Sequence, residues 1–145
     1  MIVTLLLVII CIILLINTNT PEKLEILKEK YRIIREHFIK ENMFHEIHKE
    51  MPITAFTKRG GSVGYNINKG TEIGVCLDGN INEIFHVLLH ELAHCTVKEY
   101  SHSKNFWKNF EKIRDVAIEL GIYTYISEAK DFCGKHVSDG KKNIK

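Results

Sequence analysis

The segment His90-Glu91-Leu92-Ala93-His94 constrains the fold of this 145-residue chain more than any other. On a helix, residues four apart project from one face, so the imidazoles of His90 and His94 can bind a single metal ion. Glu91 then lies beside the metal, where its carboxylate can take a proton from a metal-activated water. Because a five-residue pattern also recurs by chance, its surroundings decide whether it is a metal site.

The surrounding sequence supports a helix at this position. Asn80 and Glu83 have the spacing of a capping box at the start of a helix predicted over residues 81–97. A further helix is predicted over residues 103–120, where apolar residues recur on one face and Gly121 marks the end. The motif therefore lies inside a predicted helix that directly follows a strand.

A catalytic zinc ion needs a third protein ligand and one open position. His102 lies eight residues after His94, and eight residues reach up to about 26 Å, which is enough for the chain to fold back. Glu99, near the end of the motif helix, and His136, in the C-terminal tail, remain alternatives. We predict one Zn²⁺ ion held by His90, His94 and His102.

The other histidines and the cysteines are interpreted as structural. His86 continues the row of the motif, but each four-residue step rotates about 40° around the helix, which favours a core histidine. His45 and His48 are interpreted as an exposed pair. With no C-x-x-C pair in the chain, a disulfide framework is not expected. The cysteines interpreted as packed thiols are Cys76, Cys95 and Cys133.

The rest of the domain is predicted to combine helices with a small sheet. An apolar stripe predicts a helix over residues 21–40, followed by a short helix through Phe44 and Ile47. Three β-prone runs with turn sequences between them predict a three-stranded, mostly antiparallel meander. These runs cover residues 53–57, 62–67 and 71–77. The fold class expected is therefore α+β.

The first sixteen residues contain no charge, and all 20 basic and 18 acidic residues follow them. Sixteen helical residues rise about 24 Å, short of a ~30 Å hydrocarbon core, although residues 17–20 can lengthen the helix. A cleaved signal peptide and a buried core helix are the alternatives. No basic residue precedes the run and no Ala-x-Ala-like site follows it, so we predict an uncleaved transmembrane anchor over residues 1–18.

Charge gives an orientation and excludes one class of partner. Five basic residues follow the apolar run within residues 23–35, which places the catalytic domain in the cytoplasm by the positive-inside bias. The predicted organisation is a single-pass anchor, a helical linker over residues 19–51 and the metal-binding domain over residues 52–145. A net charge of +2 gives no electrostatic case for nucleic acid. Nothing in the sequence indicates an oligomeric state.

The motif together with Ser101-His102-Ser103-Lys104-Asn105-Phe106-Trp107 resembles the WLM group of zinc peptidases, which are related to the SprT-like proteases. Members share HELxH, a short loop, a third histidine and an aromatic residue at the start of the next helix. Virus-encoded and algal relatives also carry cysteine-containing segments like Val75-Cys76-Leu77 and Phe132-Cys133-Gly134. The resemblance covers about residues 62 to 137.

This resemblance implies a zincin-like domain with His90, His94 and His102 as zinc ligands and Glu91 as catalytic base. The expected activity is that of a zinc-dependent endopeptidase acting on protein or peptide substrates. By residue type alone, Tyr100, Tyr123 and Tyr125 are candidate groups to stabilise the oxyanion. The family's better-known members cut proteins crosslinked to DNA, but this chain has no basic DNA-binding tail. The alternative is a non-catalytic, membrane-anchored zinc-binding structural or adaptor protein, although a structural site needs no base.

Overall fold

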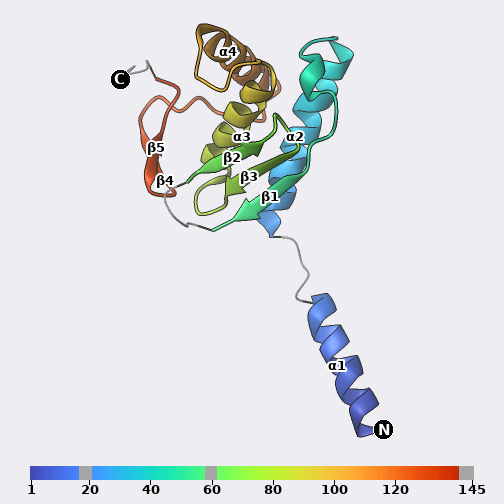
Figure 1. Ribbon diagram of the computed structural model, residues 1–145. Helices are drawn as coiled ribbons and strands as arrows, with labels where there is room; N and C mark the ends of the chain where they lie inside the picture. The colour runs from blue at the N-terminus through green and yellow to red at the C-terminus, as the bar shows by residue number, and fades with distance from the viewer. Residues whose placement is uncertain (17–20, 58–61, 141–145) are drawn as a thin grey trace.

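The computed structural model describes residues 1–16, 21–57 and 62–140. Its elements are α1 (Ile2–Ile16), α2 (Glu22–Lys40), the 3₁₀ helix η1 (His45–Ile47), β1 (Ile53–Phe56), β2 (Gly64–Ile67), β3 (Glu72–Cys76), α3 (Ile81–Cys95), α4 (Lys104–Glu119), β4 (Lys130–Phe132) and β5 (Lys135–Val137). Helices α2 and α3 cover one face of the three-stranded sheet, and α4 packs on α3 (Figure 1). The α+β fold predicted from the sequence is confirmed.

The N-terminal helix α1 is shorter than a membrane span. It contains 15 residues and rises about 22 Å, less than a hydrocarbon core of about 30 Å. Within the described ranges, no helix combines the length and the apolar character that crossing a bilayer requires. The predicted transmembrane anchor over residues 1–18, of which residues 17 and 18 lie outside the described residues, is therefore contradicted, and so is the membrane localisation inferred from it. The membrane partner predicted with the anchor is not supported.

The three predicted strands are present, but the predicted meander is wrong. The strand order is β1-β3-β2, with β3 parallel to β1 and antiparallel to β2. Burial explains this order. Three residues of β3, namely Ile73, Val75 and Cys76, are fully buried, whereas β2 alternates between half-buried and exposed residues. The most apolar strand thus takes the central position, and β2, which a meander would place there, lies at an edge.

Helix α3 is enclosed on most of its sides because it lies between the sheet, α2 and α4. Eleven of its 15 residues are buried, so the motif stands on a rigid support. Asn80 is the N-cap residue with an extended backbone, but its side chain makes no capping bond, so the predicted capping box is wrong. Helix α2 contributes Leu27, Ile34 and Phe38 to the same core. The predicted boundary between the helical linker (residues 19–51) and the metal-binding domain (residues 52–145) stays a prediction.

The C-terminal segment, which shows no clear pattern in the sequence, forms the β4–β5 hairpin. Its turn residue Cys133 is disulfide-bonded to Cys76 at the end of β3, across 57 residues of sequence. The prediction of packed free thiols is therefore wrong for these two cysteines and correct for Cys95, which is free and buried. The pairing depends on the hairpin folding back against β3, a long-range contact that cysteine spacing does not reveal.

Candidate metal centre

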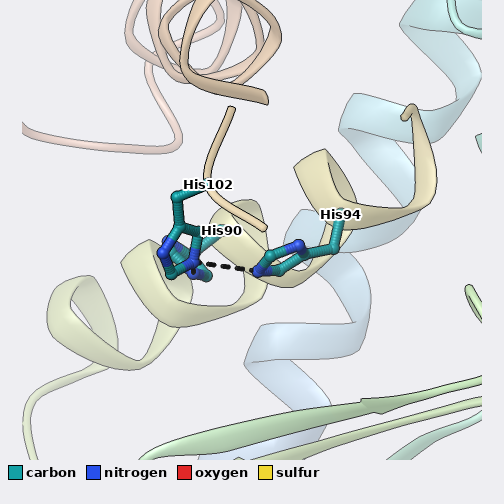
Figure 2. Close-up of side chains that lie close together, drawn as sticks. All are labelled: His90, His94 and His102. Atoms are coloured by element: carbon teal, nitrogen blue, oxygen red, sulfur yellow. Dashed lines mark hydrogen bonds between the residues drawn. The ribbon is translucent and has the colours of Figure 1, made fainter. Parts of the chain in front are cut away.

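Two elements bring three histidines together. Helix α3 carries His90 and His94 on one face, and His102 lies in the loop just before α4. The Nε2 atom of His102 is 3.0 Å from that of His90 and 3.1 Å from that of His94. In Figure 2 the three rings turn toward one another, with His102 reaching across from its loop. Ligand atoms of all three lie within 4.8 Å of one another, and the described part of the chain holds no other such group of histidines, cysteines or carboxylates.

The arrangement fits a zinc ion. Tetrahedral zinc with bonds of about 2.0–2.1 Å holds its nitrogen ligands about 3.3 Å apart, close to the observed separations. Burial and the neighbouring charges of His94 and His102 lower the pKa of His90 to about 3. Burial, His102 and Lys69 lower the pKa of His94 to about 4. Both imidazoles are thus neutral near pH 7, which is the form that binds metal.

Aromatic residues of α4 support the third histidine. The ring of His102 packs against Phe106 at 4.7 Å and against Trp107 at 5.3 Å between ring centroids. Phe106 also contacts the rings of His90 and His94, at 4.9 and 4.4 Å. α4 begins immediately after His102 because the Ser103 hydroxyl accepts a hydrogen bond from the Phe106 amide as N-cap. The short connection and the aromatic cover together place His102 over the motif.

The Glu91 side chain lies against strand β2. Only 8% of the surface of Glu91 is exposed, and burial raises the pKa of its carboxyl group to about 7. Gly64 on β2 makes room for it, since a Cβ there would come within 2.5 Å of Val87 Cγ1 and 3.2 Å of Glu91 Oε1. Glu91 and His94 also line one pocket of about 180 Å³, whose other lining residues are Asn66, Lys69 and Tyr100.

Two residues of this site, Asn66 and Lys69, were not predicted from the sequence. Asn66 Nδ2 donates a hydrogen bond to the Glu91 carbonyl oxygen at 2.9 Å, and Lys69 Nζ donates to the His94 carbonyl oxygen at 2.9 Å. Residues 68–70 show only turn chemistry in the sequence. That pattern predicts the turn correctly but says nothing of where its side chains reach.

The alternative third ligands lie elsewhere. The Glu99 side chain accepts a hydrogen bond from the Ser103 hydroxyl, and His136 pairs with Asp131 at 2.8 Å on the exposed hairpin. His48, predicted as part of an exposed pair, is instead half-buried, with Nε2 close to two backbone carbonyl oxygens.

His86 is a core histidine, as predicted. Its Nδ1 lies 2.9 Å from the hydroxyl oxygen of Tyr123, whose proton is donated to Asp139. Of the three tyrosines considered for the oxyanion, Tyr100 lines the pocket beside Glu91, while Tyr123 and Tyr125 bond to Asp139.

Known proteins resemble the chain in sequence and in fold. An uncharacterized protein of Acanthamoeba polyphaga mimivirus is 33% identical over 85 residues, which cover 52% of this chain and 43% of that protein. The match thus spans less than half of the length of this curated relative.

The crystal structure of Wss1 from Saccharomyces cerevisiae has a TM-score of 0.55 and 21% identity, covering 72% of this chain and 85% of that one. A Wss1 mutant gives a TM-score of 0.54 and 22% identity, covering 73% and 90% of the two chains. This likeness shows a shared fold. The family model of the WLM domain matches residues 32–145. Because this model covers more than half of the sequence, the chain belongs to the WLM domain family.

Proposed function

We propose that this protein is a zinc-dependent endopeptidase whose zinc ligands are His90, His94 and His102 and whose general base is Glu91. One observation carries the proposal. Three imidazole nitrogens converge on one point, and a buried carboxyl group with a raised pKa lines a pocket together with one of these histidines, His94. Family membership and the fold agree with this assignment.

Zinc, when bound, supplies Lewis-acid chemistry that activates water at neutral pH and polarises a carbonyl group. The residues of the chain supply the proton transfers. The Glu91 carboxylate takes a proton from the attacking water and returns it to the leaving amine. In the metal-free chain, burial raises the pKa of this carboxyl group to about 7. A cation nearby favours the carboxylate and so the form that acts as base.

The donor set favours an enzymatic over a structural site. Structural zinc sites close the coordination with four protein ligands, whereas catalytic sites keep one position open. Within the described residues the cluster holds three histidines, and the pocket next to it gives a substrate access to Glu91. A carboxyl group buried at this point has a chemical use in hydrolysis and none in holding a closed site.

The test is proteolysis by the purified chain. We expect the zinc-loaded chain to cleave an unfolded protein substrate, a chelator to stop cleavage, and one equivalent of zinc per chain to restore it. An inactive chain that nevertheless holds one zinc ion per molecule would instead support a structural site. Cleavage that continues in the presence of chelator would contradict the proposed zinc chemistry.

A further inference from the structure

The turn between β2 and β3 has an unusual backbone. Asn68, Lys69 and Gly70 have φ values of 46°, 57° and 103°, three consecutive residues in the left-handed region. This conformation is strained for lysine and persists only where the surrounding contacts hold it. Asn66 supplies one such contact, because its Oδ1 accepts a hydrogen bond from the Gly70 amide at 2.7 Å. The Gly70 and Thr71 amides also donate to the Ile67 carbonyl oxygen, and the Lys69 side chain supplies further contacts.

Lys69 joins the end of the motif helix to the loop that follows it. Its Nζ donates to the His94 carbonyl oxygen at 2.9 Å and to the Glu99 carbonyl oxygen at 2.6 Å. It also lies 4.4 Å from the centroid of the Tyr100 ring. The last four carbonyl groups of a helix lack partners within the helix, and a cation is favourable there. The ammonium group of Lys69 therefore acts as a cap for α3 that comes from another element.

The same loop is fixed on the far side of His102. The Ser103 hydroxyl donates to Glu99 Oε1 and accepts from the Phe106 amide at 3.0 Å. Lys69 holds the backbone of Glu99, and Glu99 holds the N-cap residue of α4. His102 thus lies between two anchored residues, on a segment of residues 96–103 that we call the ligand loop.

We propose that Lys69 is a positioning residue, which holds the ligand loop so that His102 meets His90 and His94 in a geometry that binds zinc. The inference rests on the proposed function, because it assigns to Lys69 a part in building that metal site. Partners that orient metal ligands from outside typically change metal affinity about 10- to 100-fold when they are lost. Lys69 acts through the loop backbone, and we expect an effect near the lower end, about tenfold.

Charge and positioning predict opposite signs for the loss of this lysine. An ammonium group close to a metal site repels the cation, so its removal strengthens zinc binding if charge is all that matters. If Lys69 holds the ligand loop, its removal weakens zinc binding. An arginine at this position keeps the charge and can donate to both carbonyl groups.

The experiment compares Lys69→Met, Lys69→Arg and the wild-type chain by chelator competition for zinc at one pH. Lys23→Met is the matched control, because Lys23 Nζ also donates to a backbone carbonyl, that of Gly79 at 2.6 Å, away from the site. Thermal unfolding of the zinc-free proteins and hydrogen exchange of residues 96–103 are measured alongside. These two readouts separate a displaced loop from general loss of structure.

We expect Lys69→Met to bind zinc about tenfold more weakly and to exchange faster in the ligand loop, with Lys69→Arg close to wild type and Lys23→Met unchanged. Unchanged or stronger zinc binding by Lys69→Met overturns the inference. Equal weakening of zinc binding by Lys23→Met also overturns it. If Lys69→Met unfolds, Lys69→Arg decides the matter. Loss of zinc by Lys69→Arg, with hydrogen exchange of its ligand loop as in the wild type, then overturns the inference. A wild-type chain that binds no zinc overturns both this inference and the proposed function.

Discussion

Helix α3 carries two histidine environments that differ although they are one turn apart. His90 and His94 meet His102, with aromatic rings of α4 around them and a pocket beside them. His86, four residues before His90, bonds to Tyr123 and lies 3.3 Å from Asp139 Oδ1. In the first group three imidazole Nε2 atoms face one another, and in the second the histidine takes part in a buried network of donors and acceptors.

The contrast shows what separates a ligand from a structural histidine. Burial opposes ionisation of Asp139, but hydrogen bonds from His86, the Ile126 amide and Tyr123 outweigh it and lower the pKa of its carboxyl group. Burial and Asp139 together raise the pKa of Tyr123. The members of this network thus bond to one another. The triad differs, because the Nε2 atoms of His90, His94 and His102 face one another and can together bind a cation.

The largest effect is expected from Glu91→Gln, which keeps the shape of the side chain but removes the base. Hydrolysis should fall about 100- to 10,000-fold while zinc content stays near one ion per chain. Glu83→Gln is the control, because Glu83 is an equally buried carboxyl residue at the other end of α3. Rates of substrate cleavage for both variants check this. Wild-type activity in Glu91→Gln would remove Glu91 from the mechanism.

Substitution of single histidines tests the comparison between the metal-binding triad and the His86 network. His102→Ala should weaken zinc binding by more than the roughly 10- to 100-fold that loss of an outer partner costs. His86→Ala should keep zinc but lower the free energy of unfolding by about 1–3 kcal/mol, because the Tyr123 hydroxyl oxygen loses its donor in a buried place. Chelator titration and denaturant unfolding of both variants, with His136→Ala as exposed control, give the answer. Loss of zinc in His86→Ala with retention in His102→Ala would reverse the assignment.

The disulfide bond should affect the two regions unequally. The bond between Cys76 and Cys133 ties down the hairpin that leads to Asp139, and it closes a loop across 57 residues of sequence. The double variant Cys76→Ser/Cys133→Ser should lose about 2–4 kcal/mol of unfolding free energy. Its zinc affinity should stay close to that of the wild type, since the triad belongs to α3 and the loop before α4. A marked fall in zinc affinity would show that the two regions are coupled.

The last prediction concerns pH. Burial raises the pKa of Glu91 from 4.5 to about 7, so the folded chain holds a proton that the unfolded chain releases between these values. The stability of the zinc-free chain therefore loses this contribution as pH rises from 4.5 through 7. Glu91→Gln has no such loss and should be more stable than wild type at pH 8, by up to about 3 kcal/mol, but similar at pH 5. A difference in the free energy of unfolding between Glu91→Gln and the wild type that does not change with pH would contradict the burial of an ionisable Glu91.

The sequence predicted the local elements better than their assembly. The helices at residues 22–40 and 104–119 follow from apolar periodicity, and the helix at residues 81–95 was predicted from the capping spacing at its start. The histidine triad follows from spacing and the family resemblance. Strand order, the Cys76–Cys133 bond and the contacts of Lys69 join residues distant in sequence, and no local pattern encodes them. The anchor was mispredicted because apolar character was clear while the helix length fell short.

Zinc-edge X-ray absorption of the purified, zinc-loaded wild-type chain tests the central claim most directly. We predict one zinc ion with three imidazole nitrogens at about 2.0–2.1 Å, one light non-imidazole ligand and no sulfur. A sulfur ligand at about 2.3 Å, which would point to Cys95, or a fourth imidazole would mean a closed site and would contradict the proposed open catalytic centre.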